Sequence, residues 1–166
     1  MYVNIYGDFM KDIVNWLILN KKSISVMESC TGGCISSAIT DVDNSSSIYK
    51  FGAITYSNEF KIKMGVDERV IEKYSVYSME CAKQMSKKIS DYTSSDYGIG
   101  VTGKFNKKDP NNLFGDDSSI FISIYSRSND RNYNKVITAR SGSRHENKEY
   151  VLNEIVLLFN EKIIKK

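Results

Sequence analysis

The chain has 166 residues, of which 41% are apolar and 26% are charged, with a formal net charge of +3. This length suffices for one domain with a substantial core, and the composition is that of an ordinary globular protein. The mild charge argues against the dense basic stripe of a polyanion-binding protein, so we expect no nucleic-acid partner. We interpret residues 1–166 as a single domain.

Membrane insertion and disulfide bonding are not indicated. No apolar run approaches the ~20 residues that a membrane-spanning helix needs, and the N-terminus lacks the pattern of a secretory signal. The number of cysteines, three, is odd, which argues against a disulfide framework. We therefore expect a cytoplasmic protein without a membrane partner.

The first half of the sequence alternates between helical and extended patterns. Asp8 is a candidate N-cap for a helix whose apolar residues recur at helical spacing. Strands are predicted at 23–27 and 52–56, with a helix over 34 to about 41 between them. This alternation is typical of an α/β protein.

The second half continues the same alternation. Asp67 and Ser78 are candidate N-caps of two helices. Further strands are predicted at 97–102, 118–125 and 133–139, a polar loop at 103–117, and a last helix over about 146–162. The last two strands are joined by a connection too short for a crossover, so they predict an antiparallel hairpin. We therefore expect a three-layer α/β/α sandwich with a mixed β-sheet.

The stretch SVMESCTGGCISS, at 25–37, places small polar residues between a strand and a helix. This stretch has neither the lysine of a P-loop nor a GxGxxG pattern, so ATP or dinucleotide binding by those devices is not indicated here. Ser29 lies at the edge where open α/β folds bind ligands and is a candidate nucleophile. The N–H groups at the helix start suit an oxyanion or phosphate. Alternatively, Ser29 and Thr31 only cap the helix.

A serine nucleophile needs a base. His145 is the only histidine and lies in a polar stretch, so a Ser-His-Asp arrangement is not supported. The stretch TYSNEFKIK offers Tyr56, Lys61 and Lys63 just after a strand, and a lysine whose pKa is lowered by burial can act as a base. The alternative is that both lysines belong to a solvated face.

The cysteines give a weaker signal. Cys30 and Cys34 are four residues apart, but with one histidine and no second cysteine pair they do not indicate a zinc site. We expect no metal. Cys30 is a further candidate nucleophile, although a small buried packing residue is favoured.

Two motifs, ESCTGG at 28–33 and YSNE at 56–59 followed by Lys61, form a specific pair. TDV at 40–42 lies between them, and VTG at 101–103 and Gly142 with Arg144 come after them. Together these segments resemble the C-terminal domain of the CinA family, the nicotinamide mononucleotide deamidases, over nearly the whole chain. The larger N-terminal domain of longer family members has no counterpart in this sequence, so the resemblance indicates the stand-alone form.

The resemblance implies hydrolysis of the carboxamide of nicotinamide mononucleotide to nicotinic acid mononucleotide and ammonia, without a metal or other cofactor. Ser29 is expected to attack the amide carbon, and Lys61 to accept its proton and pass it to the departing ammonia. Tyr56 is expected to orient the lysine or the serine.

The resemblance also implies a set of substrate-binding residues, with Arg144 holding the phosphate. These are Thr31, Gly32, Gly33, Ser45, Ser46, Thr102, Gly103 and Arg144. Ser29 and Ser46 are both expected to face the site, and which of them is the nucleophile stays open. The expected partners are a small-molecule nucleotide and further copies of this chain, in a homodimer or larger assembly.

The match fails in the loop at 104–117, where KFNKKDP at 104–110 stands in place of a glycine- and proline-rich segment of the family pattern. In addition, Ser143 replaces an aspartate of the family and Lys148 replaces an arginine. These changes fall in the substrate-binding half. An alternative is therefore a catalytically silent relative that binds a nucleotide or a protein partner through the same pocket.

Overall fold

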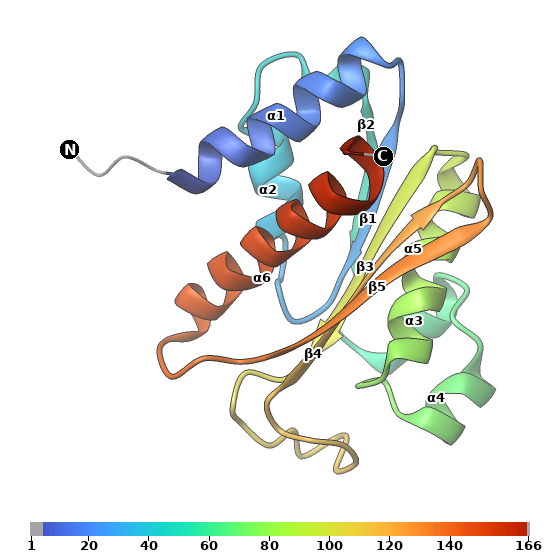
Figure 1. Cartoon of the computed structure of the whole chain (residues 1–166). Coiled ribbons are helices and arrows are strands. Elements are labelled where there is room, and N and C mark those ends of the chain that lie inside the picture. Colours follow the sequence, from blue (N-terminus) through green and yellow to red (C-terminus); the bar gives the residue numbers. More distant parts are fainter. Residues whose placement is uncertain (1–4, 166) are drawn as a thin grey trace.

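The computed structural model describes residues 5–165, in which helices cover both faces of a five-stranded sheet (Figure 1). The strands are β1 (Ile24–Glu28), β2 (Tyr49–Ile54), β3 (Tyr97–Gly103), β4 (Ser119–Ser126) and β5 (Arg131–Thr138). The helices are α1 (Ile5–Leu19), α2 (Cys34–Thr40), α3 (Asn58–Lys63), α4 (Glu68–Tyr74), α5 (Met79–Thr93) and α6 (Arg144–Phe159), with the short helices η1 (Ser45–Ser47) and η2 (Asn160–Ile164). The predicted α/β fold is confirmed.

The strand order is β2-β1-β3-β4-β5. β1 pairs in parallel with both β2 and β3, whereas β4 pairs antiparallel with β3 and β5. The sheet is therefore mixed, and the predicted hairpin of the last two strands is confirmed. The three parallel strands end at one edge of the sheet, which we call the carboxyl edge.

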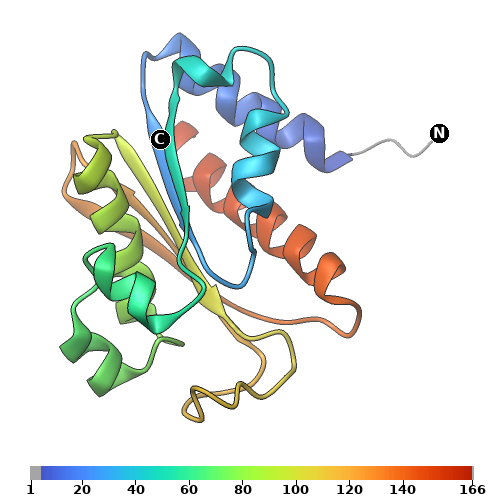
Figure 2. The same ribbon diagram turned by 180° about the vertical axis from the view of Figure 1, so that it is seen from behind.

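Helices α1, α2 and α6 pack on one face of the sheet, and α3, α4 and α5 on the other (Figures 1 and 2). The larger apolar cluster lies on the α1, α2 and α6 side, and a smaller one lies under α5. α5 comes very close to β3, because a Cβ on Gly98 would lie 2.0 Å from the carbonyl oxygen of Ser86. The glycines of β3 thus allow α5 to pack close to the sheet.

The boundaries differ from the predictions in three places. α1 begins at Ile5, so Asp8 lies inside the helix and its predicted role as N-cap is wrong. β2 begins at Tyr49 rather than at 52, and α3 was not predicted. In contrast, the predicted caps of α4 and α5 are confirmed: the side chains of Asp67 and Ser78 accept hydrogen bonds from first-turn amides.

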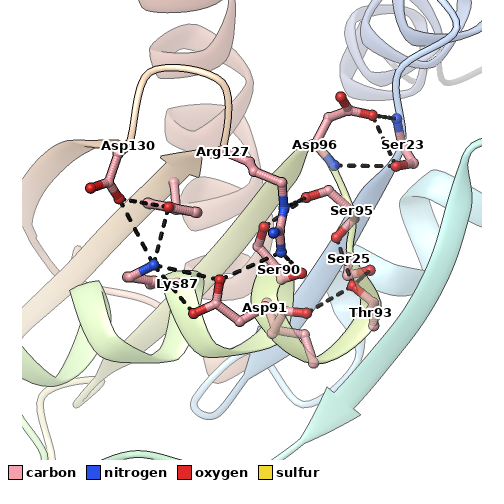
Figure 3. Close-up of polar contacts among 12 residues, drawn as sticks. Ser23, Ser25, Lys87, Ser90, Asp91, Thr93, Ser95, Asp96, Arg127 and Asp130 are labelled. Carbon is pink, nitrogen blue, oxygen red and sulfur yellow. Dashed lines mark hydrogen bonds and ion pairs between the residues drawn. The ribbon is translucent and has the colours of Figure 1, made fainter.

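The opposite, amino edge of the sheet is closed by a polar network between α5 and the strand ends (Figure 3). Arg127 donates to the carbonyl oxygens of Ser90 and Ser95. The hydroxyl of Thr93 contacts those of Ser25 and Ser95 at 2.9 and 2.7 Å. These polar groups have partners within the protein, and this edge supports the sheet.

Candidate active site

Polar residues follow each parallel strand at the carboxyl edge. Glu28, the last residue of β1, pairs in register with Ile54 of β2 and Val101 of β3. The residues after these strands therefore meet in space, together with the loop at 104–118 and the start of α6, at the lower edge of Figure 1. A cavity of about 530 Å³ opens here, which is a size typical of small-molecule sites.

Ser29, which lines this cavity, forms a direct hydrogen bond with the buried Lys61. The distance between Lys61 Nζ and Ser29 Oγ is 3.0 Å. Lys61 is only 2% exposed and Ser29 is 6% exposed. Lys61 lies in the last turn of the short helix α3, and its side chain is buried. Ser29 is the member of the pair that lines the cavity. The alternative that Lys61 belongs to a solvated face is wrong.

The surroundings of Lys61 favour a neutral amine. Burial lowers the pKa of Lys61 below its usual range. Its second partner is the carbonyl oxygen of Thr55 at 2.7 Å, which accepts one N–H. A neutral amine can donate to this carbonyl while its lone pair accepts the hydroxyl proton of Ser29. The arrangement therefore suits proton transfer from Ser29 to Lys61.

The start of α2 is occupied by the carboxylate of Glu28, a fully buried residue. Its oxygens accept from Thr31 Oγ1 (2.6 Å), from the amides of Gly33 (3.0 Å), Ile35 (3.2 Å) and Ser36 (2.8 Å), and from Ser36 Oγ (2.7 Å). The first-turn amides are thus not free for an oxyanion or a phosphate, contrary to the prediction. The alternative in which Ser29 and Thr31 cap α2 is also wrong, because Glu28 does so.

Tyr56 and Arg144 lie together at the mouth of the cavity. Arg144 donates to the hydroxyl of Tyr56 at 3.3 Å and lies 5.2 Å from the ring centroid of Phe105. Tyr56 is 65% exposed, and no hydrogen bond within residues 5–165 joins it to Ser29 or Lys61. No direct hydrogen bond therefore supports the expected role of Tyr56 in orienting Ser29 or Lys61.

The remaining residues expected to bind substrate fall into four groups. Gly103 lines the cavity, whereas Thr31, Gly32 and Gly33 line a neighbouring cavity on the other side of the turn. Thr102 is fully buried, and its hydroxyl donates to the carbonyl oxygen of Val76 at 2.9 Å.

Ser45 and Ser46 are the fourth group. They lie in η1 before β2, at the amino edge, where the Ile24 amide donates to the carbonyl oxygen of Ile48. They are separated from Ser29 by the length of β1, about 16 Å. The expectation that Ser46 faces the same site as Ser29 is wrong within this chain, because a motif's spacing does not tell which edge of the sheet it reaches.

The loop at 104–117 contributes residues that the sequence did not identify. Lys104 is 4% exposed, pairs with Asp117 at 3.0 Å and lies 4.8 Å from the ring centroid of Tyr77. The hydroxyl of Tyr77 donates to Asp109, and burial together with this bond raises the pKa of Tyr77. Side-chain clamps thus hold this loop, and its only sequence signal is the absence of the family's glycines.

The cysteines are all free. Burial raises the pKa of the Cys30 thiol to about 12 and that of Cys81 to about 11, so both are neutral and unreactive at physiological pH. Across the described residues, no cluster of three or more His, Cys, Asp or Glu side chains is arranged to hold a metal ion. Within the same range, no helix is both long and apolar enough to cross a membrane.

Comparison with known proteins places this geometry in a family. The family described as the CinA C-terminal domain matches residues 7–159. The chain belongs to this family. Its sequence is 42% identical over 105 residues to a CinA-like protein of Endomicrobium trichonymphae, and 38% identical over 105 residues to a putative competence-damage inducible protein of Clostridium perfringens. Each match covers 60% of this CinA C-terminal domain.

Coverage differs between the sequence and the structure comparisons. The chain spans about a quarter of the length of these curated relatives. It superposes on the competence damage-inducible protein A of Klebsiella pneumoniae with a TM-score of 0.88 at 20% identity, covering 98% of this chain and 99% of the other. The corresponding protein of Agrobacterium tumefaciens gives a TM-score of 0.85 at 20% identity, over 97% of each chain. These likenesses establish the fold.

Proposed function

We propose that this CinA C-terminal domain is an amidohydrolase that converts nicotinamide mononucleotide to nicotinic acid mononucleotide and ammonia. The observation that carries the proposal is the 3.0 Å contact between Ser29 Oγ and the buried amine of Lys61. A serine paired with a neutral lysine is an activated nucleophile for acyl transfer. Family membership supports the same reaction.

In the first half of the reaction, Lys61 Nζ takes the hydroxyl proton of Ser29 while Oγ attacks the carboxamide carbon. The resulting tetrahedral intermediate carries its negative charge on the former carbonyl oxygen. The amide of Cys30 is the candidate donor to this oxyanion, since among residues 5–165 it donates to no backbone carbonyl and Cys30 lines the cavity. Collapse breaks the C–N bond, and Lys61 returns the proton to the departing ammonia.

The second half regenerates the enzyme. Lys61 takes a proton from water as the water oxygen attacks the ester formed on Ser29. Collapse of this second intermediate releases the carboxylic acid, and the proton returns from Lys61 to Ser29 Oγ. Lys61 thus accepts and returns every proton that is transferred in the two halves. The thiol of Cys30, whose pKa is raised to about 12, takes no part in the reaction.

The cavity supports a substrate with a phosphate and an aromatic ring. Arg144, Lys107 and Lys108 lie in its wall, and a phosphate suits the fork of an arginine side chain. Tyr77 and Phe105 supply aromatic surface for a pyridinium ring. Because Glu28 occupies the start of α2, the phosphate is assigned to this basic wall and not to the helix.

The test is ammonia release from nicotinamide mononucleotide by the purified domain, with nicotinamide riboside and free nicotinamide as comparison substrates. We expect turnover that is fastest with the mononucleotide. Absence of ammonia at enzyme concentrations near that of the substrate would contradict the proposal.

The rebuilt loop at 104–117 supports a second candidate, a catalytically silent domain that binds a nucleotide or a protein partner. In this case calorimetry would detect binding of the mononucleotide, and no hydrolysis would follow. Assembly into a homodimer or larger oligomer is proposed on the family resemblance and is testable by light scattering.

A further inference from the structure

The hydroxyl of Thr55 is an exception to the polar pairing of this protein. Thr55 is 2% exposed, and its Oγ1 is, among the described side chains of residues 10–165, the one buried nitrogen or oxygen without a hydrogen-bond partner. A buried polar group left unpaired costs about 1–3 kcal/mol. Valine has nearly the same shape and would avoid this cost. The unpaired hydroxyl therefore calls for an explanation.

Its position suggests one. Thr55 directly follows β2, where its amide donates to the carbonyl oxygen of Glu28 at 2.8 Å. Its own carbonyl oxygen accepts from Lys61 Nζ at 2.7 Å. The carbonyl oxygen and Oγ1 are only a few covalent bonds apart. The unpaired hydroxyl thus belongs to the residue that already holds the amine.

The number of N–H groups on Lys61 changes during the proposed reaction. The neutral amine has two N–H donors and a lone pair, whereas the ammonium has three donors and no lone pair. In the resting structure Thr55 O and Ser29 Oγ are the two partners of Nζ. When the resting lone pair accepts the Ser29 proton, one of the two N–H groups donates to Thr55 O and the other has no acceptor among these partners. After proton transfer Ser29 Oγ becomes an acceptor, and the remaining N–H, now on a charged ammonium, gains more from an acceptor than it did on the neutral amine.

The other groups around Lys61 do not supply this acceptor. Cys30 and Cys81 carry thiols whose pKa is raised to about 12 and about 11, so they stay neutral and are weak acceptors. The carboxylate of Asp109, which attracts the Lys61 charge from the loop, is already bonded to Tyr77 and to Asn112. The hydroxyl of Thr55 is the unused oxygen.

We propose that Thr55 is a positioning residue whose hydroxyl accepts a hydrogen bond from the Lys61 ammonium that forms when Ser29 is deprotonated. This inference rests on the proposed function. The acceptor is empty in the ground state and filled after proton transfer, so it stabilises the transition state and not the resting enzyme. The unpaired hydroxyl destabilises the resting enzyme, and the same hydroxyl stabilises the ammonium once it forms.

The test compares Thr55→Val, which removes the hydroxyl at nearly constant shape, with Thr55→Ser, which keeps it. Thr93→Val is the matched control, because the Thr93 hydroxyl is fully bonded at the amino edge of the sheet (Figure 3). Four quantities are measured: stability to urea, kcat and KM for ammonia release, and the pKa of Lys61. The last comes from the pH dependence of acetylation of the Lys61 peptide and needs no catalytic activity.

For Thr55→Val we expect stability equal to or above that of the wild type, kcat about tenfold lower at unchanged KM, and the Lys61 pKa about one unit lower, as for one hydrogen bond to a charged group. Thr55→Ser should retain the wild-type values, and Thr93→Val should lose stability only. Wild-type kcat and Lys61 pKa in Thr55→Val would overturn the inference. So would a loss of stability like that of Thr93→Val, because the hydroxyl would then have a resting partner. If the wild type releases no ammonia, the deamidase proposal fails, and the pKa of Lys61 still decides the role of Thr55.

Discussion

At the scale of single residues, the site depends on two ionisable groups buried against their usual preference. Among the described side chains of residues 10–165, no carboxylate forms a hydrogen bond with the buried Lys61 and no cation forms one with the buried Glu28. Buried charges are costly unless they are paired or hydrogen-bonded. Lys61 meets this constraint with a lowered pKa, and Glu28 meets it with five donated hydrogen bonds. The first group is suited to exchange protons and the second to hold a turn in place.

The pH dependence of activity follows from the direction of the Lys61 pKa shift. The neutral amine is the active form, so kcat/KM should rise with pH through a single ionisation whose pKa lies below the usual value for lysine. Lys61→Arg should be inactive at every pH, because arginine stays charged. Steady-state rates across the pH range provide the measurement. A profile with no such ionisation would argue against Lys61 as the base.

The same shift gives a sign for stability. The pKa of Lys61 is lower in the folded than in the unfolded chain, so between these two values the unfolded state binds more protons. The free energy of unfolding contributed by Lys61 should therefore rise with pH across that window.

Glu28→Gln tests how the turn that carries Ser29 is held. An amide NH2 group would face donors that now meet a carboxylate oxygen, so we expect a loss of about 3 kcal/mol in the free energy of unfolding, measured with urea. We also expect kcat to fall while KM changes little, because Ser29 is displaced and the basic wall is not. Asp67→Ala removes the N-cap of α4 and should cost about 1 kcal/mol without changing kcat. Equal kcat in Glu28→Gln and the wild type would show that Glu28 does not position Ser29.

At the scale of elements, the close packing of α5 on β3 fixes the sheet that presents the site. A Cβ on Gly100 would lie 2.4 Å from the carbonyl oxygen of Ala82. Since backbone atoms cannot give way locally, α5 would have to move off the sheet. This layer therefore has little tolerance for added volume at Gly100.

Gly100→Ala should consequently destabilise the protein by about 3 kcal/mol, the upper range for overpacking. Thermal or urea unfolding is the measurement. Lys83→Ala, on the exposed side of α5, is the control and should change stability by less than about 0.5 kcal/mol. A Gly100→Ala variant as stable as this control would contradict the packing described here.

What the sequence could predict also follows from element properties. β3 is a continuous buried strand, and apolar residues recur at helical spacing along α5 and α6. These patterns were sufficient to predict the three elements from the sequence. α3 has six residues and depends on the cap of Ser57 and on burial of Lys61, a residue type that normally indicates exposure. The proximity of Lys61 to Ser29 came from motif resemblance, because no periodicity brings residues so far apart in the chain together. The roles of Glu28 and Thr55 needed coordinates, since hydrogen-bond partners are tertiary contacts.

At the scale of the whole molecule, the mixed sheet separates a closed amino edge from an open carboxyl edge. The amino edge holds the network of Arg127 and the η1 serines, and the carboxyl edge holds Ser29, Lys61 and the basic wall (Figures 1 and 3). This division follows the tendency of open α/β sheets to bind ligands where parallel strands end. Charge at the cavity mouth is therefore expected to determine substrate binding.

Arg144→Ala tests this expectation. KM for nicotinamide mononucleotide should rise about tenfold with a small change in kcat, as for the loss of one hydrogen bond to a charged group. Hydrolysis of nicotinamide riboside, which has no phosphate, should be unaffected. Arg131→Ala removes one positive charge at the far end of the hairpin and serves as the control. An equal effect of Arg144→Ala on both substrates would show that Arg144 does not bind the phosphate.

The central claim is that one alcohol and one buried amine carry out the chemistry. The most direct measurement is single-turnover ammonia release from nicotinamide mononucleotide by the wild type, Ser29→Ala and Lys61→Ala, with mass analysis of the Ser29 peptide after acid quench. We predict that the wild type releases ammonia and carries the acyl group on Ser29, and that both variants lose at least about a thousandfold in rate. Ammonia release by Ser29→Ala at the wild-type rate would contradict the account.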